Sequence, residues 1–257
     1  MKTAELFFTD NEGAGEAVVL AHAIGCDHRM WDGVAALLAP RFRVVRVDLR
    51  GHGRTPATRR PYSLEGLAED VLAVADKLGI AKIHWVGLSM GAMIGMAFAL
   101  EYPDRLARLV LANTTSSYGP EGRAMWEARA RTVAEGGLEA IKEMVMGRYF
   151  SDEFREGHRD AVAKVARWFL ATPVEGYLGC CDAIKELDYT ADLPRIHART
   201  LVIAGDKDAG TPVSMAEVIA TRIAGAQLAV IPGAAHLSAV EKPTEFGAKV
   251  RDFLASP

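Results

Sequence analysis

The pentapeptide Gly87-Leu88-Ser89-Met90-Gly91 contains the serine whose surroundings best fit a nucleophile. It follows the apolar run 83–86 and precedes a stretch rich in alanine and methionine, so Ser89 is predicted to lie on a turn from a strand into a helix. The backbone folds back on itself in such a turn, which requires small residues two positions before and after the serine, and Gly87 and Gly91 meet that need. The pattern indicates acyl transfer by a serine hydroxyl.

A serine hydroxyl is a poor nucleophile at neutral pH, so Ser89 needs a histidine within hydrogen-bond reach and an acid that orients the imidazole. Asp208 and His236 each follow a predicted strand, just past its carboxyl end, where an open parallel sheet presents its ligands. We therefore predict Ser89, Asp208 and His236 as the catalytic residues. Asp206 is the competing acid, and Asp208 is favoured because it lies nearer the following turn.

Two backbone N–H groups are expected to bind the tetrahedral oxyanion through which acyl transfer passes. The N–H of Met90 directly follows the serine and starts a helix whose dipole favours negative charge. The second is expected in the loop 22–25, which follows an apolar strand and should face the serine, with the N–H of Ile24 as the candidate. His22 is expected to shape this loop by hydrogen bonding, without taking part in proton transfer.

The elements that must position these residues alternate between short β-rich runs and helical periodicity, which is typical of a mostly parallel sheet flanked by helices. Strands are expected over 17–22, 42–48, 82–87, 106–112, 200–204 and 227–231. Helices are expected over 31–38, 64–78, 90–100, 214–223 and 244–254. Ser63 is a plausible N-cap for the second of these helices, and Gly79 closes it.

From Tyr118 to Asp192 this alternation stops, and the segment is rich in arginine, glutamate, alanine and aromatic residues at helical spacing. A helical block that interrupts a parallel sheet after the strand that follows the nucleophile is most economically a cap over the active site. We therefore expect a helical cap over 118–192, inserted into a core formed by 1–117 and 193–257.

The composition is that of a globular enzyme, with 257 residues, 50% hydrophobic and 25% charged. The net charge of −3 gives no electrostatic reason to expect nucleic acid or a membrane surface as a partner, and no apolar run approaches the length that crosses a bilayer. Cys26, Cys180 and Cys181 have neither C-x-x-C nor Cys/His ligand spacing, so neither a disulfide framework nor a zinc site is expected. A reducing, cytoplasmic location is the expectation.

With these motifs in order, the chain resembles the α/β-hydrolase superfamily over nearly its full length. Ser89, Asp208 and His236 follow the superfamily's chain order. The segment Asp48-Leu49-Arg50-Gly51-His52-Gly53-Arg54-Thr55 looks like its D-x-R-G-x-G-x-S signature, with threonine in place of the usual serine. The resemblance implies an α/β-hydrolase fold, with a mostly parallel central sheet flanked by helices and an inserted helical cap. It implies no metal and no organic cofactor.

More narrowly, the chain is similar to the 3-oxoadipate enol-lactonases of the β-ketoadipate pathway of aromatic catabolism. Five segments carry this resemblance: His28-Arg29-Met30-Trp31-Asp32, the stretch from Gly87 to Gly95, Ala112-Asn113-Thr114-Thr115, the stretch from Ala171 to Tyr177, and Ala235-His236-Leu237-Ser238. The oxyanion loop His22-Ala23-Ile24-Gly25 departs from the Asn/Ser-Leu-Gly form of many enol-lactonases and approaches the His-Gly start of other α/β-hydrolases.

This resemblance implies that Ser89 attacks the lactone carbonyl of 3-oxoadipate enol-lactone and that water then releases 3-oxoadipate from an acyl-enzyme. The substrate carries a free carboxylate, which a buried site would have to pair with a cation or several donors. Arg129, Arg131 and Lys164 are candidates for this as a group, and Trp126 is the cap residue expected over the pocket.

The predicted triad would serve other reactions equally well. The alternatives are a general carboxylesterase or thioesterase of the same fold and a C–C bond hydrolase that acts on vinylogous diketones. A non-catalytic ligand-binding relative is the alternative from outside the enzymes. The expected partner is a small anionic lactone or ester, with neither nucleic acid nor a membrane.

Overall fold

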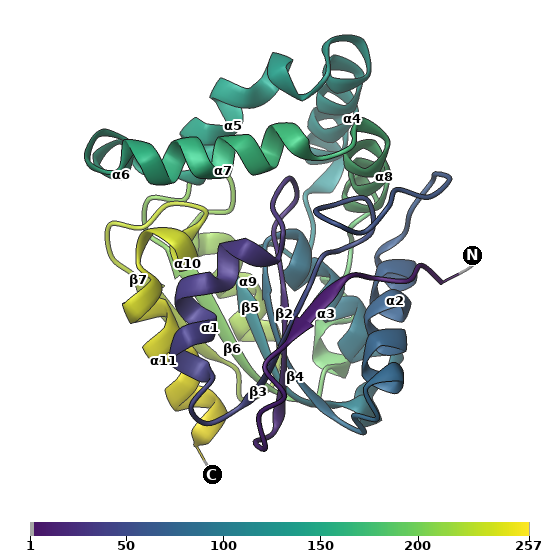
Figure 1. Cartoon of the computed structure of the whole chain (residues 1–257), viewed down its shortest axis with the longest axis vertical. Helices are drawn as coiled ribbons and strands as arrows, with labels where there is room; N and C mark the ends of the chain where they lie inside the picture. Colours follow the sequence, from purple (N-terminus) through teal and green to yellow (C-terminus); the bar gives the residue numbers. More distant parts are fainter. Residues whose placement is uncertain (1–2, 257) are drawn as a thin grey trace.

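A mostly parallel sheet forms the centre of the protein (Figure 1). The computed structural model describes residues 3–256. Within that range the sheet has seven strands in the order β1-β3-β2-β4-β5-β6-β7, and β1 runs antiparallel to β3 while the other pairs are parallel. The strands are β1 (Phe8–Asp10), β2 (Ala17–Ala21), β3 (Arg43–Val47), β4 (Ile83–Leu88), β5 (Leu106–Ala112), β6 (Arg199–Gly205) and β7 (Gln227–Ile231).

The predicted strands are confirmed, with ends that differ by no more than one residue from the ranges expected. β2, β4 and β6 lie where runs of apolar residues are buried on both faces of the sheet, as inner parallel strands require, whereas β7 at the sheet edge is largely exposed. β1 is the strand that the sequence did not predict. It has three residues, all half-buried, at the edge of the sheet.

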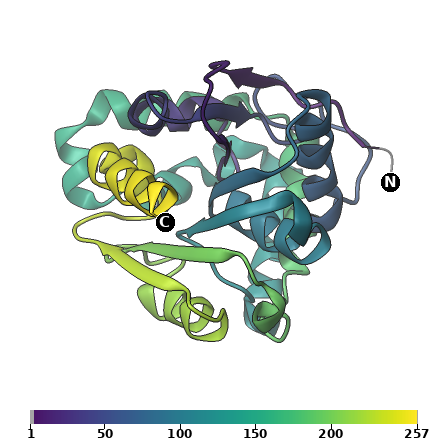
Figure 2. The ribbon, with the colours of Figure 1, turned by 90° about the horizontal axis from the view of Figure 1, so that it is seen from below.

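Helices cover both faces of the sheet (Figure 2). α1 (Asp32–Leu38) and α11 (Pro243–Ala255) pack against each other on one face. α2 (Leu64–Lys77), α3 (Met90–Glu101) and α9 (Val213–Arg222) lie on the other. The short segments between strands and helices are η1 (His28–Trp31), η2 (Pro103–Arg105), η4 (Leu193–Arg195) and α10 (Ser238–Glu241).

Local signals placed several helix ends correctly. The Ser63 hydroxyl accepts a hydrogen bond from the Gly66 N–H at 3.1 Å, which confirms the N-cap of α2. Gly79 follows that helix with a φ of +66°, a conformation that glycine adopts without steric cost. The helix expected from Trp31 begins instead at Asp32, because the residues before it form the η1 turn.

The segment between β5 and β6 forms a layer of helices over the carboxyl ends of the strands (Figure 1). We call α4–α8 the cap helices: α4 (Gly119–Gly136), α5 (Lys142–Tyr149), α6 (Asp152–Gly157), α7 (Arg159–Ala171) and α8 (Val174–Lys185), with the short η3 (Leu138–Ile141) between α4 and α5.

α8 is docked closely on the loop that follows β3. A methyl group added to Gly176 would overlap the backbone of Gly51, so the two glycines allow the chains to approach at that point. An ion pair between Arg60 and Asp182, with an N···O distance of 2.8 Å, ties the same helix to the core. Among residues 3–256, no helix combines the length and the apolar character needed to cross a membrane.

Candidate active site

Ser89 lies on a strained turn between β4 and α3. Its φ of 55° and ψ of −115° fall outside the regions that non-glycine residues prefer. Methyl groups on Gly87 or Gly91 would overlap neighbouring backbone, that of Gly91 in the first case and that of Ala21 in the second. The Ser89 N–H donates to the Ala112 carbonyl at 2.8 Å, which anchors the turn to β5. This is the geometry that exposes a serine hydroxyl at the end of a strand.

Asp208 and His236 lie together at the ends of the two neighbouring strands β6 and β7. The His236 Nδ1 is 2.8 Å from the Asp208 Oδ2. Asp208 is buried and also accepts hydrogen bonds from the Asn113 side-chain amide at 3.0 Å and from the Thr211 hydroxyl at 2.6 Å. Burial alone would raise the pKa of Asp208, but the adjacent imidazole and these donors hold it well below the ordinary value.

The carboxylate therefore remains ionised and accepts from Nδ1–H of His236. That bond leaves Nε2 of the imidazole free to act as a base. Asp206, the competing acid, is exposed and accepts a hydrogen bond from the Gly233 N–H at 2.7 Å. The structure thus brings Asp208 to the histidine, and it leaves Asp206 in a turn on the surface.

The backbone N–H groups of Ile24 and Met90 have no hydrogen-bond partner within residues 3–256. Met90 starts α3, so its N–H points out of the helix toward positions where negative charge is favoured. Ile24 lines the same pocket as Ser89. These two donors fit the chemistry of an oxyanion site, which requires preorganised N–H groups without another acceptor.

Two buried histidines hold the loop that contains Ile24. His22 donates from Nδ1 to the Ala23 carbonyl at 2.8 Å and accepts at Nε2 from the Leu49 N–H at 2.9 Å. His52 accepts at Nε2 from the Gly25 N–H at 2.9 Å. Accepting an N–H requires a neutral ring, and burial lowers the pKa of both histidines, that of His52 to about 3.

A pocket lies between these core residues and the cap helices. The core contributes Ser89, His236, Ile24, Gly210 and Thr211, and the cap side contributes Tyr118, Met125, Trp126, Arg129, Val145, Arg148 and Tyr149. A lining of apolar and aromatic side chains with a few polar groups among them is typical of a small-molecule site.

Arg129 of α4 brings a positive charge to this pocket. Its Nε and Nη2 atoms are buried without a hydrogen-bond partner in residues 3–256. The guanidinium carbon lies 4.8 Å from the centre of the Trp126 ring and 5.6 Å from that of Tyr177, so aromatic faces surround the cation. The Trp126 Nε1 is likewise buried without a partner in the described chain. Donors with this arrangement are suited to an anion.

The other cap cations predicted from the sequence lie elsewhere. Arg131 is exposed and lines a groove on the outer side of α4 and α8. The Lys164 Nζ lies 4.0 Å from the Asp32 Oδ2 and 5.1 Å from the centre of the Trp168 ring. Arg148 does line the pocket, at an exposed position, and the sequence did not single it out.

The sequence also gave no sign of Tyr149 and Glu241 as site residues. Tyr149 ends α5, lines the pocket and stacks on the His236 ring, with 5.8 Å between ring centres and 19° between ring planes. Glu241 is buried and accepts a hydrogen bond from the Ala235 N–H at 3.0 Å. No local sequence pattern marks either residue, since Tyr149 contacts a histidine far away along the chain and Glu241 also accepts a hydrogen bond from the distant Ser151 N–H.

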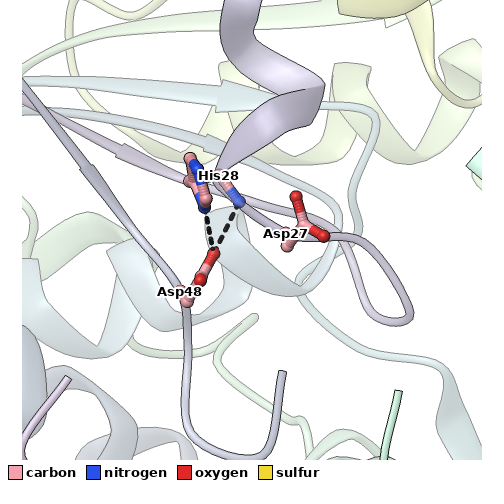
Figure 3. Close-up of side chains that lie close together, drawn as sticks. All are labelled: Asp27, His28 and Asp48. Atoms are coloured by element: carbon pink, nitrogen blue, oxygen red, sulfur yellow. Dashed lines mark hydrogen bonds and ion pairs between the residues drawn. The ribbon is translucent and has the colours of Figure 1, made fainter. Parts of the chain in front are cut away.

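Asp27, His28 and Asp48 form a cluster whose atoms are close enough to hold a metal ion (Figure 3). Protein donors already occupy their carboxylates. Asp27 accepts hydrogen bonds from Nε and Nη2 of Arg29, at 2.9 and 2.5 Å respectively. Asp48 accepts from the backbone N–H of His28 at 2.8 Å and from its Nδ1 at 2.7 Å. We interpret the cluster as a brace that joins the loop after β2 to the loop after β3.

Comparisons with known proteins agree with this architecture. The family model described as alpha/beta hydrolase fold matches residues 16–243. A 3-oxoadipate enol-lactonase of Acinetobacter baylyi is 34% identical over 90% of this chain and 85% of its own length. The solved enol-lactonase from Burkholderia xenovorans LB400 is 35% identical, with a TM-score of 0.94 over 98% of this chain and 97% of that one. The putative carbamate hydrolase RutD of Caulobacter vibrioides is 31% identical over 93% of this chain and 90% of its own.

Proposed function

The chain belongs to the alpha/beta hydrolase family, and from that premise we propose that it is a serine hydrolase that opens the ring of 3-oxoadipate enol-lactone to give 3-oxoadipate. The observation that carries the choice of substrate is that Nε and Nη2 of Arg129 are buried without a hydrogen-bond partner among residues 3–256, beside the pocket that Arg129, Ser89 and His236 all line. A small lactone with one free carboxylate would supply the acceptors that this cation lacks.

The proposed reaction begins with attack of the Ser89 hydroxyl oxygen on the lactone carbonyl. His236 accepts the hydroxyl proton at Nε2, and Asp208 stabilises the imidazolium that forms. The tetrahedral oxyanion accepts hydrogen bonds from the N–H groups of Ile24 and Met90. Collapse of this intermediate breaks the ring C–O bond, and the enol oxygen leaves as an enolate.

The leaving group remains part of the acyl chain, because the ring held both halves together. The enolate takes up the proton that His236 had accepted and becomes the ketone, which makes the ring opening favourable and returns His236 to its neutral form. Water then attacks the acyl-enzyme with His236 as general base, and the second tetrahedral intermediate releases Ser89 and the product carboxylate. The overall reaction consumes one water molecule and requires no oxidant or reductant.

The relatives support a hydrolase but differ in the bond they cleave. Two curated relatives are named 3-oxoadipate enol-lactonases, and another is named a putative carbamate hydrolase. Arg129 favours the lactone, because the proposed substrate has a carboxylate distant from its reacting carbonyl. We therefore propose a role in the catabolism of aromatic compounds, with a small anionic lactone as partner and neither nucleic acid nor a membrane.

The test is hydrolysis of freshly generated 3-oxoadipate enol-lactone beside a short p-nitrophenyl ester and a simple carbamate. We expect kcat/KM for the lactone to exceed the other two by at least about a hundredfold, since each buried charge-assisted contact contributes a few kcal/mol. Ser89→Ala should abolish all turnover, while Ser214→Ala, a change at an exposed serine of α9, should leave it intact.

Turnover of the ester or carbamate without turnover of the lactone would overturn the proposed substrate assignment. It would leave the proposed serine mechanism unaffected. Lactone turnover that survives Ser89→Ala would overturn the serine mechanism. Absence of turnover on any member of a broad ester panel, with a folded protein, would favour a non-catalytic ligand-binding role.

A further inference from the structure

Tyr149 connects the cap to both halves of the proposed catalytic machinery. Its hydroxyl donates a hydrogen bond to the Ile24 carbonyl oxygen, and its ring stacks on the imidazole of His236. The residue is buried, with 3% of its surface exposed, so water does not compete strongly for the hydroxyl. One cap side chain therefore contacts the oxyanion loop and the candidate general base together.

The contact with Ile24 matters because of the peptide plane that it fixes. The Ile24 carbonyl and the Gly25 N–H belong to one peptide unit, and that N–H donates to the Nε2 of His52 at 2.9 Å. Gly25 has a φ of +70° and no side chain, so its own backbone torsions restrict a rotation of this plane less than those of another residue would. Tyr149 and His52 hold the plane from its two ends, directly next to the Ile24 N–H.

The backbone around Tyr149 is itself fastened to the histidine loop. The Leu237 N–H donates to the Tyr149 carbonyl at 2.9 Å. Glu241 accepts from the Ser151 N–H at 2.6 Å and from the Ala235 N–H at 3.0 Å, so one carboxylate joins residues on either side of the contact. The ring of Tyr149 is thus held against His236 by its own main chain.

We propose that Tyr149 is a positioning residue that holds the Ile24 N–H and the His236 ring in the orientations required for attack by Ser89. The Tyr149 hydroxyl keeps the Ile24 N–H directed at the position of the oxyanion, and the Tyr149 ring restricts the His236 imidazole to one orientation. Burial raises the pKa of Tyr149 well above its ordinary value, so the hydroxyl remains a donor throughout the working range. The inference rests on the proposed serine chemistry, and it holds for any acyl substrate.

The test compares Tyr149→Phe with Tyr62→Phe. The first change removes the hydroxyl and keeps the ring. The second is a matched control, because Tyr62 is also buried and its hydroxyl also donates to a backbone carbonyl, that of Thr58 at 3.1 Å. Reactive sites are counted with a fluorophosphonate, and kcat for a p-nitrophenyl ester is expressed per labelled site. Affinities are measured for a trifluoromethyl ketone, which mimics the tetrahedral state, and for 3-oxoadipate.

Tyr149→Phe should lower kcat per labelled site about fivefold to tenfold, the effect of one hydrogen bond, with KM within twofold. The affinity for the ketone should fall by the same factor, while that for 3-oxoadipate stays unchanged. Tyr149→Leu, which also removes the ring, should lower kcat further. Tyr62→Phe should change none of these quantities.

Two outcomes would overturn the proposal. If Tyr149→Phe reduces only the number of labelled sites, the tyrosine stabilises the fold and does not position the site. If kcat and ketone affinity both stay within twofold of the wild type, the contact with Ile24 has no role in the reaction. A wild-type protein that neither reacts with the fluorophosphonate nor hydrolyses esters would contradict the proposed function itself, so the two failures are distinguishable.

Discussion

Replacement of Arg129 by glutamine tests how the pocket selects its substrate. The Nε and Nη2 atoms of Arg129 are buried without acceptors among residues 3–256, so a carboxylate could accept two charge-assisted hydrogen bonds along one edge of the guanidinium. Each such bond contributes about 1.5–3 kcal/mol. Because paired bonds are not additive, we expect Arg129→Gln to cost about 2–4 kcal/mol, which is roughly a 30- to 1,000-fold loss in kcat/KM for the lactone.

The assay uses two substrates that differ only in charge. The first is 3-oxoadipate enol-lactone, and the second is its analogue in which a carboxamide replaces the free carboxylate. Arg129→Gln should lower kcat/KM for the lactone that carries the carboxylate. For the carboxamide analogue kcat/KM should change less than about threefold, because the reacting ester is the same. Arg131→Gln is the matched control, since Arg131 lies two residues further along α4 on its exposed side.

Equal losses on the charged and neutral lactones would refute this reasoning. They would show that Arg129 supports the pocket through its contacts with the Trp126 and Tyr177 rings. A loss in Arg131→Gln as large as that in Arg129→Gln would place the carboxylate outside the pocket, in the groove between α4 and α8.

Three further predictions follow from individual contacts. Asp208→Asn should lower kcat by about a thousandfold or more in steady-state assays, because the imidazole loses its orienting carboxylate, whereas Asp206→Asn should stay within about twofold. The unfolded chain binds a proton on His52 below about pH 6.5, whereas the buried ring, with a pKa of about 3, does not. The free energy of unfolding should therefore fall by up to about 1.4 kcal/mol per unit as the pH drops below 6.5, and urea titrations of His52→Gln should show a shallower slope. Gly176→Ala should lower the urea-derived free energy of unfolding by about 1–3 kcal/mol, since the added methyl overlaps the backbone of Gly51; an unchanged value would show that α8 can shift freely.

The sequence predicted the sheet well because most of its strands are short apolar runs separated by helices or turns. Burial on both faces makes such runs continuous, and the turn that carries Ser89 has its own signature in Gly87 and Gly91. β1 escaped prediction because three half-buried residues at a sheet edge form neither an apolar run nor a clear alternation.

The candidate site was predictable to the extent that its residues follow strand ends. Ser89, Asp208 and His236 each come after a parallel strand, so their proximity follows from topology. On α4, the three-residue spacing of Trp126 and Arg129 places both on one helix face, a signal that would have separated Arg129 from Arg131.

Tyr149 could not be found in the same way. Its hydroxyl bonds a carbonyl 125 residues away, and its ring stacks on a histidine from a third segment. These contacts depend on how the cap helices dock on the core, and that docking is set by long-range packing, for which a single sequence carries no local pattern.

The most direct test of the central claim is to titrate lactone hydrolysis against covalent labelling of Ser89. The protein would be treated with increasing fractions of one equivalent of a fluorophosphonate, and the labelled peptide would be identified by mass spectrometry. We predict that activity on 3-oxoadipate enol-lactone falls linearly to zero as the label on Ser89 approaches one per chain, and that excess lactone slows the labelling. Full lactone hydrolysis by protein that is completely labelled at Ser89 would contradict the account.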